Sequence, residues 1–138
     1  MKTQPEQNET ILFFEDGILG FEDIKRYKLI FSPDISPFIY LQSAQCDHPC
    51  FVVCDPVQFV PGYRLQYSRR IREELKAQSE EDIRFLAIAT IPDNIRDITI
   101  NLKSPIVLNI KNNLAKQWVT DEPDYPIRYR LINDDRMA

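Results

Sequence analysis

Apolar and polar residues alternate along residues 98–110, and this segment carries the clearest strand pattern in the chain. Its first half has an apolar residue at every second position, namely Ile98, Ile100 and Leu102. A period of two is typical of a strand with one buried face. Beyond Pro105 the alternation resumes with Ile106, Leu108 and Ile110. Because proline cannot donate a hydrogen bond to a neighbouring strand, the pattern predicts two strands, or one long strand bent at Ser104-Pro105.

Further segments have the length and composition of short strands, and they are 11–14, 28–31, 38–43, 50–54, 63–67, 84–91, 116–120 and 125–132. Many are bounded by proline, glycine or aspartate, which favour turns. The segment 84–91 is long and mostly apolar, which is typical of a central strand. Together with the two strands predicted within 98–110, the chain has about nine or ten short strands.

Only one segment, 69–78, has a convincing helical pattern. Ile71 and Leu75 lie four residues apart and so share one face of a helix, and Ser68 is a favourable N-cap residue. The segment 79–82 is predicted to add one further turn. One short helix among many short strands predicts an all-β fold, a small distorted β-barrel or sandwich of mostly antiparallel strands.

Length and the composition of the two ends predict a single domain. A chain of 138 residues is long enough to bury one core. Residues 1–10 are expected to be a flexible N-terminus and residues 133–138 a loose C-terminal tail, because both ends are polar. The domain is therefore predicted to span residues 11–132.

The charge of the chain excludes some classes of function. Lys and Arg number 17 and Asp and Glu number 21, which gives a net charge of −4. We therefore expect no direct binding to nucleic acid, which requires cations to neutralise phosphates. The sequence has no apolar run long enough to cross a membrane and no signal-peptide core at its start. These features predict a cytoplasmic protein with reduced cysteines, and we expect it to be monomeric.

Cysteine and histidine residues gather in one short stretch. Cys46, His48 and Cys50 are spaced at every second residue, and Cys54 follows nearby. Zinc prefers such ligands, but a structural zinc site normally takes paired ligands from two places in the chain. We therefore interpret the cysteines as strand residues and His48 as a loop residue, and we expect no bound metal.

No set of residues typical of an active site occurs in the sequence. A Cys–His pair would need to face each other at hydrogen-bond distance, which neighbours in one loop rarely do. Gly17 and Gly20 predict a chain bend with positive φ or close backbone approach, not a phosphate-binding loop, because no Lys-Ser/Thr pair follows. Asp16, Asp55 and Asp93 lie beside turns, where aspartate commonly caps the backbone. We expect no catalytic activity and no cofactor.

Acidic residues cluster around the predicted helix and the turn after it. They are Glu73, Glu74, Glu80, Glu81 and Asp82. The usual explanation of such a cluster is a solvated surface. The alternative is a docking surface for a basic protein, with Glu80, Glu81 and Asp82 as its contacts.

Several segments together resemble one known family. The bend 17–21 is similar to a Gly-Ile/Leu-Pro-Gly-Phe signature, 36–43 to a Ser-Pro-Phe…Leu-Gln-Ser strand, and 101–109 to an Asn-Leu-x-Ala-Pro-Ile-x-x-Asn core. Similar pieces occur at 51–63, 79–82, 116–117 and 125–128. In order and spacing these segments resemble the flagellar assembly factor family FliW over about residues 11–130.

The sequence departs from this family in a few places. Residues 1–9 have no clear version of the strand with which the family usually opens. Leu19 replaces a frequent proline in the bend, and Ser104 replaces a frequent alanine. The segment after Ile132 is longer than usual.

The resemblance implies a small β-barrel-like domain that regulates and does not catalyse. Family members bind the translational regulator CsrA and relieve its repression of flagellin mRNA. They also bind flagellin, so that export of flagellin frees them to sequester CsrA. The resemblance thus implies CsrA and flagellin as partners of this chain. The alternatives are a flagellin-specific cytoplasmic chaperone without CsrA binding, and a small hydrolase or ligand-binding barrel, for which a deep polar pocket would be the sign.

Candidate partner-binding residues are those in the matching motifs that the core does not obviously require. They are Gln42, Asp55, Phe59, Asn101 and Asn109, beside the acidic Glu80, Glu81 and Asp82. Asn101 and Asn109 are predicted to share one strand face. They either contact a partner or hold neighbouring turns by hydrogen bonds.

Overall fold

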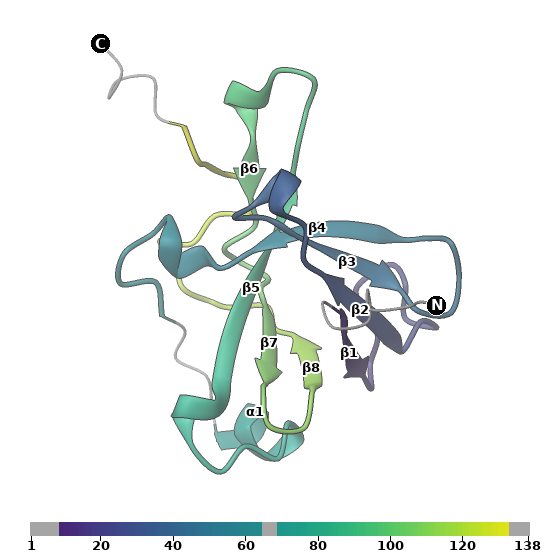
Figure 1. Cartoon of the computed structure of the whole chain (residues 1–138). Helices are drawn as coiled ribbons and strands as arrows, with labels where there is room; N and C mark the ends of the chain where they lie inside the picture. Colours follow the sequence, from purple (N-terminus) through teal and green to yellow (C-terminus); the bar gives the residue numbers. More distant parts are fainter. Residues whose placement is uncertain (1–8, 65–68, 133–138) are drawn as a thin grey trace.

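The computed structural model describes residues 9–64 and 69–132. In this part of the chain nine strands form one sheet, and Figure 1 shows β1 to β4 running across β5, β7 and β8. The strands are β1 Glu9–Phe14, β2 Arg26–Ile30, β3 Ile39–Ser43, β4 Cys50–Cys54, β5 Ile83–Thr90, β6 Thr99–Ile100, β7 Ile106–Asn109, β8 Leu114–Gln117 and β9 Tyr129–Arg130. The helix is α1 Arg69–Glu74, and the 3₁₀ turns are η2 Pro33–Ile35, η3 Pro56–Gln58, η4 Glu80–Asp82 and η5 Ile95–Asp97.

Seven of the strands close into a barrel. Their order is β4-β3-β2-β1-β8-β7-β5, and a pairing between β4 and β5 joins the two ends. The pair β1–β8 is parallel and the other pairings are antiparallel. β6 pairs with β5 and β9 with β6, so these two extend the sheet beyond the barrel. The predicted fold class, an all-β barrel of mostly antiparallel strands with one short helix, is confirmed.

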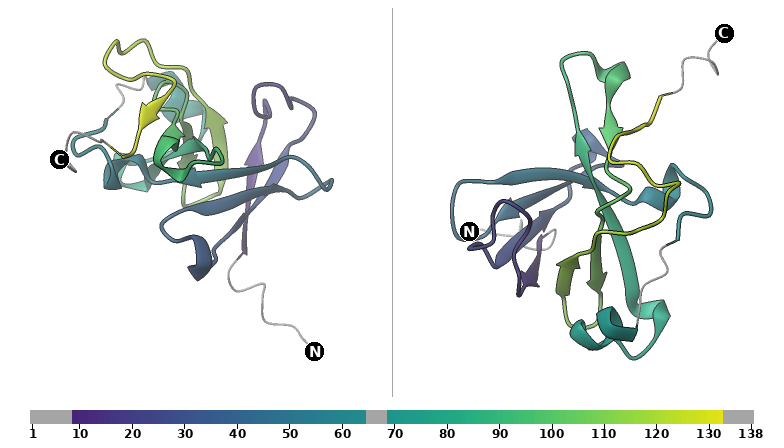
Figure 2. Two further views of the ribbon diagram at one scale, coloured as in Figure 1. Left: turned by 90° about the horizontal axis from the view of Figure 1, so that it is seen from above. Right: turned by 180° about the vertical axis from the view of Figure 1, so that it is seen from behind.

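Two hydrophobic cores lie on opposite faces of β5 and β7. Leu86, Ile106 and Leu108 point into the barrel, where they join Leu12, Phe14 and Leu41. The intervening Ala87 and Val107 point outward into a second core, which Ile71 and Leu75 cover together with residues of the segment 118–131. Because β7 is covered on both faces, all four of its residues are buried. Figure 2 shows these covering segments on one side of the long strand β5.

Strands β6 and β7 form one long bent strand along a single edge of β5. Ile100 pairs with Ala89, and Ile106 pairs with Leu86. The two pairs are three residues apart in β5 (89 − 86) but six residues apart in the facing strand (106 − 100). The facing strand therefore contains three extra residues between them. They form a bulge before Pro105, where a missing N–H is tolerated. The predicted bend at Ser104-Pro105 is confirmed.

Helix α1 is shorter than predicted because the chain reverses at Lys76. The N–H of Lys76 donates to the carbonyl of Glu73, and the N–H of Ala77 donates to that of Arg72. This is the Schellman arrangement, which requires a left-handed residue after the helix, and Lys76 has φ +55. Ile71 and Leu75 are both buried, as predicted. The predicted N-cap Ser68 lies outside the described residues.

The bend at 17–21 needs glycine for two reasons. Gly17 has φ +68 and Gly20 has φ +90, values that L side chains rarely adopt. A Cβ on Gly17 would also lie 2.6 Å from the Cα and carbonyl oxygen of Glu22. The prediction of positive φ with close backbone approach is confirmed.

Several predicted boundaries were wrong. β1 begins at Glu9, so residues 9 and 10 belong to the sheet and not to a flexible end. Tyr63 and Arg64 are not in a strand, and the rest of the predicted strand 63–67 lies outside the described residues, as do 1–8 and 133–138. Of the predicted strand 125–132 only β9 pairs, because the residues before it cover the second core. Similarly, β8 ends at Gln117, and Trp118 packs against that core.

Candidate partner-binding surfaces

Asn101 and Asn109 both hold turns, but they do not share an exposed face. The Oδ1 atom of Asn101 accepts hydrogen bonds from the N–H groups of Lys103 and Ser104, both at 3.0 Å, and so stabilises the bulge. Asn109 is only 1% exposed. Its Nδ2 donates to the carbonyl of Leu75 at 2.9 Å, and its Oδ1 accepts from the N–H of Lys111 at 2.9 Å. The alternative interpretation of these residues, that they hold neighbouring turns, matches the geometry.

Gln42 also makes internal hydrogen bonds. Its Nε2 donates to the carbonyl of Asp47 at 3.0 Å and lies 3.4 Å from that of Cys46. These contacts hold the loop between β3 and β4. In that loop Cys46 and His48 are exposed, as is Cys50 at the start of β4, whereas Cys54 is fully buried. Burial, followed by the charge of Asp55, raises the pKa of the Cys54 thiol to about 12.

The acidic cluster lies among cations. Glu74 contacts Arg70 at 2.8 Å and Lys116 at 3.1 Å, and Glu80 contacts Arg64 at 3.4 Å. These hydrogen bonds, first from Arg70 and then from Lys116, hold the pKa of Glu74 below its usual value. Ser79 accepts a hydrogen bond from the N–H of Glu81 and caps the predicted turn η4. The geometry fits a solvated, charge-balanced surface better than a strongly acidic one.

Asp55 and Phe59 lie at or beside a groove on the surface. The Oδ1 atom of Asp55 accepts a hydrogen bond from the N–H of Val57 at 3.0 Å, which caps η3 and leaves the other carboxylate oxygen outside this bond. The ring of Phe59 stacks on that of Phe38 at 6.0 Å between centroids. Asp55 and Phe59 are thus the two predicted residues that lie at or beside this groove.

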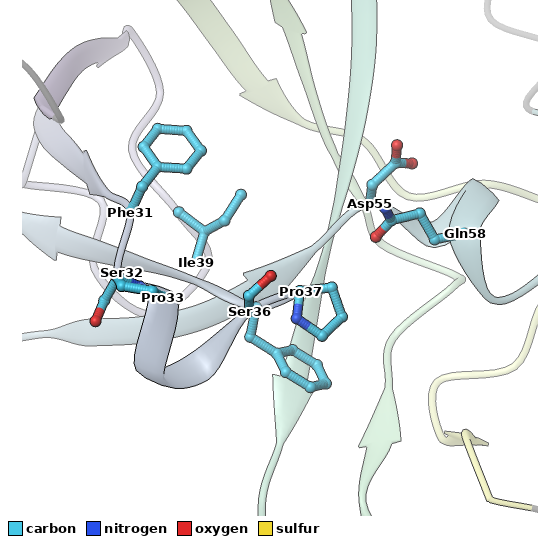
Figure 3. A pocket seen from close by; sticks show the side chains of 9 residues that line it. Phe31, Ser32, Pro33, Ser36, Pro37, Ile39, Asp55 and Gln58 are labelled. Atoms are coloured by element: carbon cyan, nitrogen blue, oxygen red, sulfur yellow. The ribbon is translucent and has the colours of Figure 1, made fainter.

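The first groove has a volume of about 440 Å³. Its lining residues are Phe31, Ser32, Pro33, Ser36, Pro37, Phe38, Ile39, Asp55 and Gln58. In Figure 3, Phe31 and Ile39 lie on one side and Asp55 and Gln58 on the other, with Ser36 and Pro37 between them. The groove is open and its lining mixes apolar and polar groups, so it is not the deep polar pocket expected of a small hydrolase.

A second groove adjoins the first, and the two share Ser36 and Phe38. Its volume is about 390 Å³ and its lining is mainly apolar. The lining residues are Asp34, Ile35, Ser36, Phe38, Tyr40, Val52, Ile91, Ile95 and Ile98. We call the two grooves together the Phe38 surface.

Three apolar side chains of the Phe38 surface are largely exposed. Ile95 is 65% exposed, and Phe31 and Ile91 are each 48% exposed. Sequence reasoning missed all three as site residues. The sequence contained a usable signal for two of them. Phe31 and Ile91 each follow a strand and stand within two residues of a proline, so each lies where a strand ends. An apolar residue at such a position need not be buried in the core.

Comparison with known proteins decides the family of the chain. The family model described as FliW protein matches residues 1–131. The chain belongs to the FliW family. A relative named Flagellar assembly factor FliW from Caldicellulosiruptor saccharolyticus is 34% identical over 126 residues, which cover 91% of this chain and 82% of the relative. The factor of the same name from Clostridium beijerinckii is 36% identical over 132 residues, which cover 96% of this chain and 92% of the relative.

A solved FliW structure has the same fold. The crystal structure of the flagellar assembly factor FliW superposes with a TM-score of 0.83 at 32% identity and covers 96% of this chain and 91% of that one. FliW proteins are flagellar assembly factors and not a known family of enzymes. Within residues 9–64 and 69–132 no group of three or more His, Cys, Asp or Glu side chains is placed to hold a metal. No helix in these residues is long and apolar enough to span a membrane.

Proposed function

We propose that this FliW protein binds the translational regulator CsrA and relieves its repression of flagellin mRNA, and that it also binds flagellin in a partner switch. Membership of the FliW family is the observation that carries this proposal. In the proposed cycle, flagellin and CsrA compete for the protein. Export of flagellin frees it to sequester CsrA, so flagellin synthesis follows filament assembly. A cytoplasmic location is part of the same proposal, because CsrA acts on mRNA before flagellin is exported.

Two physical features support a protein-binding role. The net charge of −4 disfavours direct contact with RNA, since RNA binding draws on an excess of cations. The Phe38 surface presents apolar side chains to solvent, and exposed apolar patches rimmed by polar groups are typical of protein interaction sites. Both features suit a protein that acts by sequestering other proteins.

Calorimetric titration of the full chain with purified CsrA, and separately with monomeric flagellin, tests the proposal. We expect saturable binding of each, and prebound flagellin should block CsrA. Cell-free translation of flagellin mRNA should fall when CsrA is added and recover when this protein is added. Binding of flagellin without CsrA would favour a flagellin-specific chaperone instead, and binding of neither would overturn the proposal.

A further inference from the structure

The Phe38 surface combines apolar side chains with charge of a single sign. Asp34 and Asp55 are its charged lining residues, and the lining of both grooves contains no Lys, Arg or His. Asp34 is exposed, and Asp55 has one carboxylate oxygen beyond its bond to Val57. A matching partner segment must therefore offer apolar side chains with a lysine or arginine beside them.

Neighbouring residues fix the backbone and side chains around the two grooves but leave the grooves open. Phe38 stands between the two grooves, and its ring is supported by stacking on Phe59. On one side η5 is capped by Asn94, whose Oδ1 accepts the N–H of Arg96 at 3.1 Å. This cap fixes the turn that carries Ile95 while the Ile95 side chain stays mostly in solvent. Aromatic and aliphatic side chains that neighbouring residues hold in place around an open groove are typical anchors for a binding partner.

Of the two proposed partners, a filament subunit such as flagellin is the one expected to offer the matching chemistry. A filament subunit carries apolar surface that becomes buried only when it assembles. CsrA is an RNA-binding protein, whose RNA-contacting surface is expected to be strongly cationic. Such a surface would favour a more acidic partner surface than one with two carboxylates.

We infer that the Phe38 surface binds an apolar segment of flagellin that bears a lysine or arginine, and that this segment is one that assembly later buries. This inference rests on the proposed function. The apolar side chains of the segment enter the two grooves, and its cation lies near Asp55. The site thereby covers flagellin surface that would otherwise promote premature association.

One double variant and a matched control double variant test the apolar contact. Ile91→Ser with Ile95→Ser removes apolar side chains that are 48% and 65% exposed. Val119→Ser with Ile127→Ser is the control, because these residues are 50% and 57% exposed and line neither groove. We expect the first double variant to bind monomeric flagellin at least about tenfold more weakly, whereas the control binds as the wild type does. Urea unfolding of all the proteins checks that both variants remain folded, as we expect.

A charge variant tests the carboxylate. Asp55→Asn keeps the Oδ1 acceptor that caps η3 but removes the negative charge. We expect flagellin binding to weaken about threefold and to become less sensitive to salt. Asp124→Asn, on an exposed aspartate outside both grooves, should change neither property.

The same variants are titrated with CsrA as the second probe. We expect CsrA binding to be unchanged by Ile91→Ser with Ile95→Ser. Unchanged flagellin binding would overturn the inference and leave the proposed function standing. A loss of CsrA binding, alone or equal to the loss of flagellin binding, would overturn the assignment of this surface to flagellin. Failure of the wild type to bind either protein would remove the proposed function, and the inference would fall with it.

Discussion

The two ends of strand β5 are built with opposite chemistry. At the Ile83 end, polar groups from α1, the turn after it, β7 and β8 contact one another, as in the hydrogen bond from Asn109 to the Leu75 carbonyl and the ion pair of Lys116 with Glu74. At the Thr90 end, the Phe38 surface leaves apolar side chains such as Ile95 in solvent. In Figure 1, α1 lies at one end of β5 and β6 at the other. A strand of eight residues separates these regions by about 26 Å.

This contrast separates stability from binding. Buried polar groups contribute to folding only when their partners are in place, so the Ile83 end should be sensitive to substitution. Exposed apolar side chains contribute little to folding, so the Thr90 end should tolerate substitution without unfolding. A surface that does not serve the fold is available to serve a partner.

Among the polar side chains at the Ile83 end, the largest expected effect on stability is at Asn109. Asn109→Ala removes two hydrogen bonds from a fully buried position and should lower the free energy of unfolding by about 2–4 kcal/mol. Asn112 also donates to the Leu75 carbonyl, at 3.1 Å, but its side chain is exposed. Asn112→Ala should therefore cost about 1 kcal/mol or less. Urea unfolding of both variants checks this order, and equal costs would contradict it.

Tyr63 tests the bulge that joins β6 to β7. Its hydroxyl group donates to the carbonyl of Leu102 at 2.8 Å in a buried position. Burial, followed by the nearby Tyr125, raises the pKa of this hydroxyl. Tyr63→Phe leaves the Leu102 carbonyl without this donor and should cost about 1–2 kcal/mol. Thermal unfolding measures the cost, and a Tm equal to that of the wild type would show that the bulge does not depend on this bond.

Lys116 tests the charge network at the Ile83 end. It contacts Asp16 and Glu74, and it lowers the pKa of Asp16. Burial alone would lower the pKa of Lys116, but these hydrogen bonds raise it overall. Lys116→Met keeps the length of the side chain, and because both carboxylates are partly exposed it should cost only about 1 kcal/mol at pH 7.

The same variant predicts a pH dependence with a definite sign. Asp16 and Glu74 have lowered pKa values in the folded protein, so their stabilisation is present above their ordinary values of 3.8 and 4.5 and is lost as the pH falls. The difference in unfolding free energy between wild type and Lys116→Met should therefore shrink between pH 7 and pH 3. Urea unfolding at several pH values checks this, and a difference that grows toward pH 3 would contradict the network.

The smallest effect on stability should be at the Thr90 end. Ile95→Ser should change the free energy of unfolding by no more than about 0.5 kcal/mol, because the side chain is mostly in solvent. Ile100→Ser, at a fully buried position in β6, provides the contrast and should be strongly destabilising. Urea unfolding compares the two, and a large cost at Ile95 would mean that the Phe38 surface serves the fold.

The sequence alone predicted the parts of the fold that depend on local chemistry. Strand β4 has the predicted bounds, the glycine bend has the predicted φ values, and the strand pair in 98–110 bends at Pro105. Hydrophobic period and proline position determine these features within a few residues. The left-handed Lys76 that shortens α1 was not predictable, because it depends on the polar groups that meet the end of the helix.

The candidate site was harder to predict than the fold. Gln42, Asn101 and Asn109 lie in the matching motifs, yet their side chains hold loops and turns. The Phe38 surface is built from residues near 31–38, 55–59 and 91–98, and only closure of the barrel brings them together. Such a surface has no signature within any one segment, although exposed apolar residues beside prolines gave a partial signal.

Photo-crosslinking at the Thr90 end tests most directly whether this end of the protein binds a partner. A benzophenone amino acid replaces Ile95 in one variant and Ile127 in another, and each is irradiated with monomeric flagellin. We expect a flagellin adduct from position 95 and none from position 127, with the adduct lost when unlabelled wild-type protein competes. An adduct from position 127 and none from position 95 would contradict the assignment of partner binding to the Phe38 surface.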